Sequence, residues 1–281
     1  KNHVIMPPMC MYLADTDGKA TEKHLLHYAT RAVGGVGLII VEATAISPEG
    51  RIQNSDLGLW CDEQIEPLKK VVQACHHHGA KMALQIAHAG RKGFDRDNLV
   101  APSSIAFSES YGFPHELSTE DILALAEKFA HTAKRAVEAG FDMIEIHAAH
   151  GYLLHEFLSP LSNHRQDEFG GSLINRIRFL KLVLEKVKAV IPEAMPVLLR
   201  VSASDYDVGG IDIEEMVRII NEVRHHIDMV HVSSGGLLNQ GIEAYPGYQV
   251  EFSRIIRESC QTPTITVGLI TDSKMTEEIL K

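Results

Sequence analysis

The chain has 281 residues and a formal net charge of −10, with 45% hydrophobic and 23% charged residues. This length and apolar content favour one large α/β domain with a sizeable core and argue against disorder. The acidic balance disfavours nucleic acid as a partner and leaves only local basic sites for phosphate groups. Four scattered cysteines, no Cys-x-x-Cys pair, and no stretch like a signal peptide or membrane span predict a cytoplasmic protein without membrane contact.

Short apolar runs alternate with longer amphipathic stretches along the chain. Each run is short enough to be a buried parallel strand, and a helical pattern follows it. The predicted strands are residues 4–9, 36–43, 81–87, 143–148, 197–202, 229–233 and 264–268. The predicted helices are residues 21–33, 62–78, 119–139, 172–191, 213–226, 249–259 and 273–280. Seven such units predict a parallel sheet with crossover helices.

The positions of the polar residues favour a barrel over an open doubly wound sheet. An open dinucleotide-binding sheet should carry Gly-x-Gly-x-x-Gly directly after its first strand, and this sequence contains no such string. Polar and unusual residues cluster instead just after the predicted strands, where a (β/α)₈ barrel builds its active site. We therefore expect residues 1–281 to form one (β/α)₈ TIM-barrel domain. Because only seven units are visible where eight are needed, we expect this sequence to be truncated at both ends.

The segment around the fourth predicted strand contains the clearest chemical signal. Alternation along residues 144–147 places Glu145 and His147 on one face, with His147 at the end of the strand. His150 follows, and the two imidazoles can converge only if the strand stops between them, which the next glycine favours. Together with Tyr152 they would supply two hydrogen-bond donors for an oxygen and a phenol that can give a proton. Zinc binding by the histidine pair, or a structural role for one histidine, remains an alternative.

Longer strings of residues resemble the old yellow enzyme family. Residues 144–172 read IEIHAAHGYLLHEFLSPLSNHRQDEFGGS, which is similar to the signature of that family. Residues 8–12 (PMCMY), 85–92 (QIAHAGRK) and 200–205 (RVSASD) resemble its bacterial NADPH dehydrogenase subgroup. The resemblance implies an FMN-dependent ene-reductase that takes hydride from NADPH or NADH. By a ping-pong transfer it would reduce activated C=C bonds of α,β-unsaturated carbonyl or nitro compounds.

The resemblance also implies which residues contact the cofactor. FMN would lie across the mouth of the barrel, with Cys10 near its reactive edge, where the sulfur would tune the reduction potential. Gln85 offers a donor and an acceptor to the pyrimidine edge, and Arg200 places a positive charge where reduced flavin becomes negative. The expected cofactor-binding residues are Pro7, Pro8, Met9, Cys10, Ala43, Gln85, Arg200, Ser234, Gly235 and Gly268. The last three belong to glycine-rich strand ends that could hold the phosphate.

The same resemblance assigns the substrate chemistry. His147 and His150, helped by Tyr12, would bind the carbonyl or nitro oxygen, and Tyr152 would give a proton to the α-carbon. No metal is expected at this site. Pro7 departs from the subgroup, which usually has serine there, so one side-chain hydrogen bond to the flavin would be absent.

Three further expectations concern the surroundings of the site. Residues 93–118 form a long loop, rich in Ser, Pro and aromatic residues, that suits a cover over the active site. The role of the preceding basic pair, Arg91 and Lys92, is ambiguous, because a basic pair on a loop is usually solvated surface. The resemblance also implies a homo-oligomer, either a dimer or a tetramer.

Other functions remain open from the sequence. A larger relative such as a dienoyl-CoA reductase would add an iron–sulfur cluster and further domains, although no cluster-like cysteine spacing appears. A metal-dependent barrel hydrolase would use the two histidines as ligands, and a non-catalytic flavin-binding protein would bind FMN without turnover.

Overall fold

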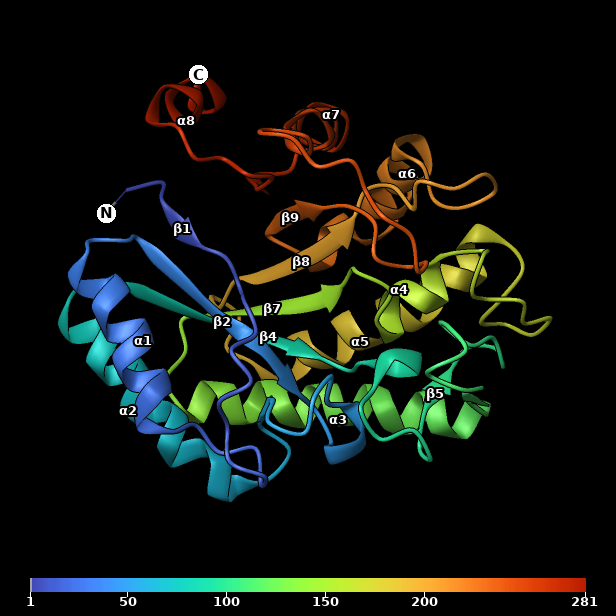
Figure 1. Cartoon of the computed structure of the whole chain (residues 1–281), viewed down its shortest axis with the longest axis horizontal. Helices are drawn as coiled ribbons and strands as arrows, with labels where there is room; N and C mark the ends of the chain where they lie inside the picture. The colour runs from blue at the N-terminus through green and yellow to red at the C-terminus, as the bar shows by residue number, and fades with distance from the viewer. Residues whose placement is uncertain (1) are drawn as a thin grey trace.

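A parallel barrel forms the centre of the molecule (Figure 1). The computed structural model describes residues 2–281. All seven predicted strands are present: β1 (Ile5–Met6), β2 (Leu38–Ala45), β4 (Lys81–Ala87), β7 (Met143–Ala148), β8 (Val197–Ser202), β9 (Met229–Ser233) and β10 (Thr264–Thr266). They pair in the order β1-β2-β4-β7-β8-β9-β10. This parallel order with helical crossovers is that of a nearly closed (β/α)₈ barrel, as predicted.

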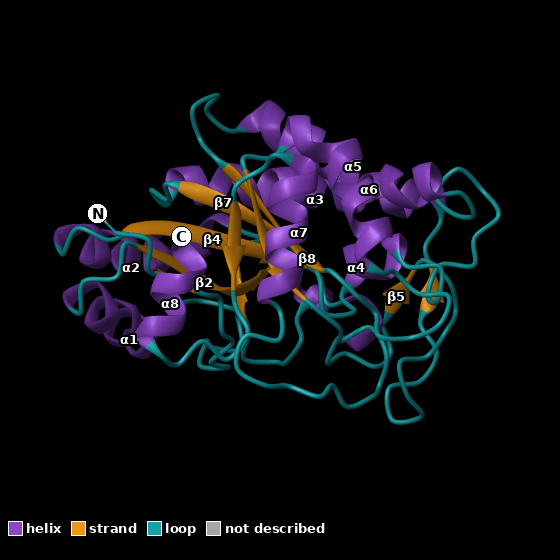
Figure 2. Cartoon of the chain, turned by 90° about the horizontal axis from the view of Figure 1, so that it is seen from above, coloured by secondary structure: helices purple, strands orange, loops and turns teal. Residues whose placement is uncertain are grey.

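The helices surround the strands, as Figure 2 shows. They are α1 (Glu22–Val33), α2 (Ile65–His77), α3 (Thr119–Glu138), α4 (Leu153–Leu158), α5 (Leu173–Val190), α6 (Ile213–Val223), α7 (Val250–Cys260) and α8 (Ser273–Leu280). Short 3₁₀ turns are η1 (Pro48–Gly50), η2 (Asp62–Gln64), η3 (Gly90–Lys92) and η4 (Arg224–His226). The predicted helix at 62–78 is therefore a 3₁₀ turn followed by α2. None of the helices within residues 2–281 is long and apolar enough to cross a membrane.

Several short elements have no counterpart in the sequence prediction. Helix α4 lies inside the signature segment directly after the turn that follows β7. Strand β3 (Leu57–Gly58) pairs with the end of β2, and β5 (Val100–Ala101) pairs with β6 (His115–Glu116) inside the long loop after β4. These additions all lie near the carboxyl ends of the strands, where the loops are longest.

Burial of both faces explains why the strands read as apolar runs. Every residue of β2 and of β8 is buried between the barrel interior and the helix layer. Outside the strands, helix α3 contributes Phe129 and helix α5 contributes Phe179, and both rings are fully buried. Phe157 of α4 packs against Phe179 with ring centroids 4.8 Å apart. This contact connects α4 to α5 in the helix layer.

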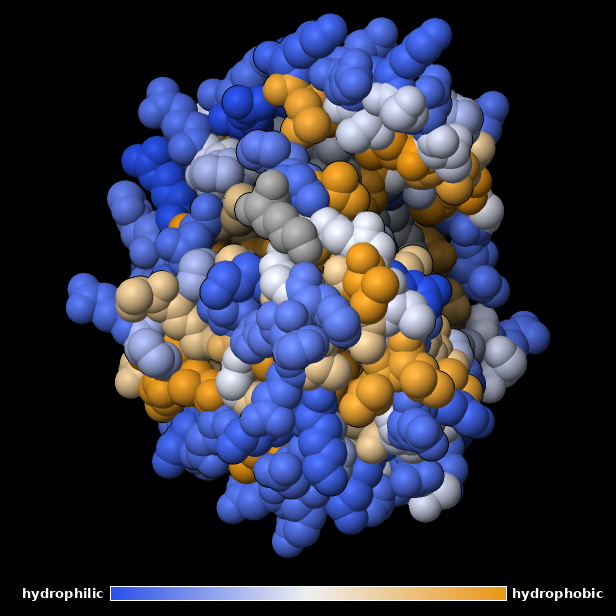
Figure 3. All heavy atoms as spheres, turned by 90° about the vertical axis from the view of Figure 1, so that its left-hand side faces the viewer, coloured by the Kyte–Doolittle hydropathy of each residue, from blue (hydrophilic) through white to orange (hydrophobic). Residues whose placement is uncertain are grey.

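The barrel is open between β1 and β10, which are not paired within residues 2–281. Helix α8 has no buried residue. Figure 3 shows the side of the molecule on which α1 and β1 lie, with apolar side chains among the polar ones. Four apolar residues are exposed near this opening: Val4 just before β1, Leu26 and Val33 in α1, and Leu280 in α8. The helix layer is least complete on this side.

Candidate active site

A tight turn after β7 brings the predicted catalytic residues together. The strand ends at Ala148, and the chain then reverses through two residues with positive φ, His150 (59°) and Gly151 (70°). A Cβ on Gly151 would lie 2.3 Å from the carbonyl oxygen of Gly236, so only glycine fits. The ring of His147 lies 5.2 Å from that of His150 and 5.1 Å from that of Tyr152, between centroids. The strand thus stops between the two histidines, as predicted.

Side chains of β8 and α4 hold this turn. The backbone N–H of His150 donates to Ser202 Oγ of β8 at 2.9 Å. The N–H of Gly151 donates to His155 Nδ1 of α4, also at 2.9 Å. His155 is fully buried, and its Nε2 lies 2.9 Å from Asp205 Oδ1. The polar groups of the turn are therefore paired, which fixes the positions of both imidazoles.

Both imidazoles are neutral at physiological pH. Burial, reinforced by the positive charge of Arg200, holds the pKa of His147 and of His150 well below the usual range. A neutral imidazole has one donor and one acceptor nitrogen. Nδ1 of His147 accepts from the Ala149 N–H at 3.3 Å, which leaves Nε2 as its donor. Nε2 of His150 lies 2.7 Å from Ser233 Oγ, so only Nδ1 remains for a ligand.

Tyr152 keeps its proton in this setting. Burial raises the pKa of Tyr152, and the neighbouring Cys10 and Tyr12 raise it further. Lys92 lies over the ring, with Nζ 5.0 Å from the centroid. The influence of Cys10 and Tyr12 places the segment after β1 within electrostatic range of the turn after β7. A protonated phenol beside two imidazole donors can supply a proton to a bound molecule.

The basic pair Arg91 and Lys92, which the sequence leaves ambiguous, is not solvated surface. Arg91 is only 2% exposed, and it donates to the carbonyls of Leu237 at 2.8 Å and Ile105 at 3.2 Å. Lys92 Nζ donates to the carbonyl of His150 at 2.9 Å, and burial lowers the pKa of Lys92 to about 8. Carbonyls of other loops converge on both side chains, and this tertiary arrangement cannot be read from local composition.

The long loop after β4 reaches the site through this pair. Lys92 Nζ lies 4.5 Å from the centroid of the Phe107 ring and 3.0 Å from the carbonyl of Gly236. The ammonium group of Lys92 thus contacts the ring of Phe107 and also that of Tyr152. The loop therefore lies against the candidate substrate position, in agreement with its predicted placement.

The segment after β1 is held by a buried carboxylate. Glu42 is 1% exposed, and its Oε2 accepts from the Met11 N–H at 2.7 Å. Burial, together with the nearby carboxylates Asp56 and Glu42, raises the pKa of Cys10 to about 12, so Cys10 is a thiol at neutral pH. Tyr12 has a φ of 55° and remains 42% exposed. Pro7 and Pro8 have no N–H, so their backbones offer a flavin carbonyl oxygens only.

A network of hydrogen bonds inside the barrel holds the side chain of Gln85. Its Nε2 donates to Glu145 Oε1 at 2.7 Å, and His231 Nδ1 lies 2.7 Å from Glu145 Oε2. One of the two amide protons is thus engaged, and Gln85 has its oxygen and a second N–H to offer to a cofactor. Burial opposes the charge of Glu145, but His231 and Arg200 outweigh it and lower the pKa of this carboxyl.

Arg200 is a buried cation with an unused donor. It is 8% exposed, and its Nε has no hydrogen-bond partner within residues 2–281. Burial of an arginine is costly unless a negative or accepting group faces it. The isoalloxazine ring of FMN supplies such a group at its pyrimidine edge, which becomes negative on reduction. The residues present therefore fit the cofactor that the sequence predicts.

The predicted phosphate residues also lie together. Gly235 and Gly268 both have positive φ, 68° and 116°, at the ends of β9 and β10. Ser234 Oγ accepts from Gln249 Nε2 at 2.7 Å and from the hydroxyl of Tyr206 at 2.9 Å. With both contacts donating, the hydroxyl proton of Ser234 is free for an acceptor such as a phosphate oxygen. The Cβ position of Gly268 lies 3.1 Å from the backbone nitrogen of Gln249.

The remaining predicted residues lie in β2 and in the segment after β1. Ala43 is buried in β2, next to Glu42, while Met9 is 50% exposed in the segment after β1. No group of three or more potential metal ligands occurs within residues 2–281.

Several residues that position the site were not predicted from the sequence. The residues that hold the two site segments are Glu42, Ser202, Ser233 and Gln249, together with the pair His155 and Asp205. Glu42 had a signal, because an acid within the apolar run 38–45 must have buried partners. Ser202 and Ser233 follow apolar strands, but nothing local shows that their hydroxyls face the turn.

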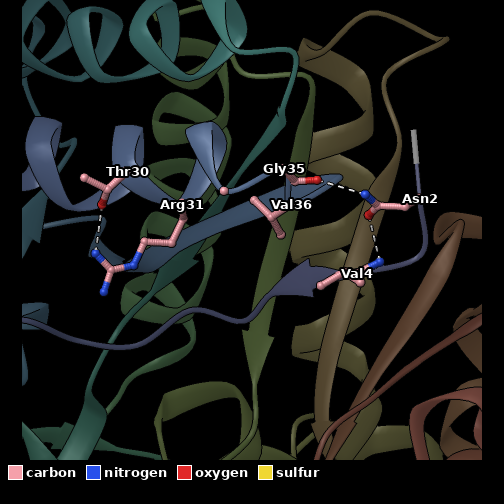
Figure 4. A pocket seen from close by; sticks show the side chains of 7 residues that line it. Asn2, Val4, Thr30, Arg31, Gly35 and Val36 are labelled. Carbon is pink, nitrogen blue, oxygen red and sulfur yellow. Dashed lines mark hydrogen bonds between the residues drawn. The ribbon is translucent and has the colours of Figure 1, made fainter. Parts of the chain in front are cut away.

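A cavity lies at the opposite end of the barrel. It has a volume of about 570 Å³ and is lined by Asn2, Val4, Thr30, Arg31, Gly34, Gly35 and Val36. Figure 4 shows the side chain of Asn2 between Gly35 and Val4. These residues precede β1 and β2, so the cavity is at the amino ends of the strands. The polar groups described above are all at the carboxyl ends, where barrel enzymes place their chemistry.

Comparison with known proteins gives one consistent result. The model of the NADH:flavin oxidoreductase / NADH oxidase family matches residues 1–281. The chain is 54% identical to an NADPH dehydrogenase of Clostridium acetobutylicum and 50% identical to one of Bacillus subtilis, in each case over 100% of this chain and 83% of the relative. A solved old yellow enzyme homologue of Zymomonas mobilis matches with a TM-score of 0.85 and 29% identity, over 100% of this chain and 81% of that one. The chain belongs to the NADH:flavin oxidoreductase / NADH oxidase family and is an FMN-dependent NAD(P)H oxidoreductase.

Proposed function

We propose that the enzyme reduces activated C=C bonds of α,β-unsaturated carbonyl or nitro compounds in a ping-pong reaction. The observation that carries this proposal is the convergence of two neutral imidazoles, His147 and His150, on a protonated phenol, Tyr152. When bound, FMN supplies the hydride that the reduction requires, after it has been reduced by a nicotinamide dinucleotide.

The protein residues have separate tasks in this reaction. His147 Nε2 and His150 Nδ1 donate to the carbonyl or nitro oxygen and stabilise the negative charge that develops there. Tyr152 holds its proton because its pKa is raised, and it gives this proton to the α-carbon once that carbon becomes basic. Phe107 and Lys92 close one side of the site against water. Tyr12, exposed at the edge of the site, completes the substrate contacts.

The cofactor side is assigned in the same way. Arg200 would bind the edge of the ring that becomes negative on reduction, Gln85 would offer its oxygen to the ring's N–H, and Cys10 would contribute a neutral thiol. Pro7, Pro8, Met9 and Ala43 would line the ring. Ser234, Gly235 and Gly268 would hold the phosphate.

The setting of the enzyme is proposed on the resemblance to its relatives. The similar proteins of Clostridium and Bacillus are named NADPH dehydrogenases, and we propose NADPH as the preferred reductant here. Residues 1–281 would act as one FMN-binding domain, in the cytoplasm, as a homodimer or homotetramer.

The visible spectrum tests the proposal in one titration. Protein purified with its flavin should be yellow, lose its absorption when NADPH is added without oxygen, and recover it when cyclohexenone is added. Saturated cyclohexanone is the matched control and should not restore the colour. A flavin that bleaches but is not reoxidised by any enone or nitroalkene would contradict the reduction of C=C bonds. A colourless protein that does not bind added FMN would remove the cofactor assignment.

A further inference from the structure

The pair His147 and His150, which we call the clamp, is connected to helix α7. A chain of hydrogen bonds leads from the amino end of α7 to His150. Gln249, at the amino end of α7, is 2% exposed. Its Nε2 lies 3.2 Å from Ser233 Oγ and 2.7 Å from Ser234 Oγ. Ser233 Oγ in turn lies 2.7 Å from His150 Nε2. The chain thus connects three segments whose residues are far apart in the sequence.

The chemistry of the groups sets the direction of each hydrogen bond. An amide nitrogen carries two protons and accepts none, so Gln249 donates one to Ser233 and one to Ser234. Ser233 Oγ is then an acceptor toward Gln249. Within residues 2–281 the acceptor within reach of its own hydroxyl proton is His150 Nε2, and this proton would have no partner if Nε2 donated instead. The nitrogen that receives this proton, Nε2, must itself be unprotonated. In a neutral imidazole the proton is then on Nδ1.

We propose that Ser233 and Gln249 are positioning residues. Through their chain of hydrogen bonds, which we call the relay, they lock His150 in the Nδ1–H form. This inference rests on the proposed function, in which Nδ1 of His150 donates to the substrate oxygen. Without the lock, an imidazole could present an acceptor lone pair to that oxygen and repel it. His147 reaches the complementary state by another route, since its Nδ1 accepts from the Ala149 N–H and its Nε2 carries the proton.

The same amide links the clamp to the phosphate residues. Because both protons of Gln249 Nε2 are used, the orientation of the amide is fixed by two hydroxyls at once. Ser234 also accepts from the Tyr206 hydroxyl at 2.9 Å and so directs its own proton away from the chain. A group bound at Ser234 would therefore stabilise the arrangement that keeps His150 a donor.

Nitrogen NMR of the flavin-loaded protein tests the proposal directly. In protein labelled with ¹⁵N-histidine, two-bond correlations distinguish the Nδ1–H from the Nε2–H form, and the His150→Ala variant identifies the signals of this residue. We expect Nδ1–H for His150 and Nε2–H for His147. An Nε2–H signal from His150 in the unmodified protein would overturn the proposal.

A near-isosteric substitution should reverse the lock. In Gln249→Glu the ionised carboxylate can only accept, so Ser233 turns its proton toward it and His150 must donate from Nε2. We expect the NMR signal of His150 to switch form and the affinity for para-hydroxybenzaldehyde, measured with FMN bound, to fall roughly 10- to 100-fold. Retention of the Nδ1–H form in this variant, with the carboxylate ionised, would count against the relay.

Two further variants test whether the effect on His150 is specific to the Ser233 hydroxyl. Ser233→Ala removes the relay hydroxyl without adding charge and should give a mixture of forms and an affinity loss of roughly 3- to 10-fold. Ser204→Ala removes a hydroxyl of the same size from the adjacent loop, where it accepts from the Tyr206 N–H, and should leave both readouts unchanged. Equal losses in both variants would show that the effect is not specific to Ser233.

The NMR result is independent of turnover. If His150 proves to be Nδ1–H while no enone reoxidises the flavin, the proposed function fails and the relay stands. If enones are reduced while His150 is Nε2–H, the relay fails and the function stands.

Discussion

The two segments that carry the site differ in how firmly they are held. The turn after β7, residues 147–152, forms hydrogen bonds with side chains of β8, β9, α4 and η3. The segment after β1, residues 7–12, has no regular structure, and its backbone forms one hydrogen bond with a side chain, donated by the Met11 N–H to Glu42. Donors that must stabilise charge need fixed positions, whereas a group that adjusts a cofactor's electronics needs only to be near it. We therefore expect the same kind of substitution to cost more in the turn than in the segment.

Tyr152→Phe should give the largest effect, because it removes the one proton donor from the firmly held turn. Reoxidation of the reduced flavin by an enone should slow by roughly 10²- to 10⁴-fold, while reduction by NADPH stays nearly unchanged. Stopped-flow absorbance of the two half-reactions separates these steps. Equal slowing of both would show that Tyr152 serves binding in general and does not act as the proton donor.

Asp205→Ala tests whether the buried pair under the turn supports it. Asp205 Oδ1 faces His155 Nε2, and Oδ2 accepts from Ser159 Oγ at 2.7 Å and from the Ile211 N–H at 2.8 Å. Loss of this carboxylate leaves three buried donors unpaired, so we expect the free energy of unfolding to fall by about 3–5 kcal/mol. Urea denaturation measures this. Asp207→Ala, on the exposed part of the same loop, is the control and should change little.

The acid dependence of stability gives a second readout for Asp205. Burial opposes its charge, but His155, Ser159 and the Ile211 N–H outweigh burial and lower the pKa of this carboxyl. A carboxyl with a lowered folded pKa contributes stability that is full above its unfolded pKa of about 3.9 and is lost as the pH falls through the folded value. The loss of stability below about pH 4 should therefore be smaller in Asp205→Ala than in the unmodified protein. Parallel acid profiles of the two proteins would contradict this assignment.

His147→Ala should weaken the binding of a phenol that imitates the substrate oxygen. One hydrogen bond to a charged oxygen is worth roughly 1.5–3 kcal/mol, so the affinity for para-hydroxybenzaldehyde should fall about 10- to 100-fold. Titration of the long-wavelength absorption of the phenol complex gives the dissociation constant. His225→Ala removes an exposed histidine from η4 and should bind as tightly as the unmodified protein. Unchanged affinity in His147→Ala would remove this residue from the clamp.

The strands and most helices could be predicted because burial on two faces leaves a clear apolar pattern in the sequence. Helix α4 and the two-residue strands β5 and β6 could not, since elements this short have no period to detect. The same limit applies to the site. His147 and Tyr152 lie in one continuous motif, whereas Ser233 and His150 are 83 positions apart and meet only because β7, β8 and β9 are neighbours. Contacts set by strand order are not visible in any local pattern.

Cys10→Ala should give the smallest effect, because it changes one neutral group in the loosely held segment. Burial raises the pKa of Cys10 to about 12, so the side chain that we propose to lie near the cofactor is an uncharged thiol at neutral pH. Loss of one weak interaction of about 0.5–1.5 kcal/mol corresponds to a shift of about 10–30 mV in the two-electron reduction potential. FMN should remain bound, since Arg200 and the residues near Ser234 are untouched. Equilibration with a reference dye measures the potential, and Cys61→Ala, at the start of η2, is the matched control. A shift as large as that of removing a charge would mean that Cys10 is ionised in the holoenzyme, and no shift would make it a packing residue.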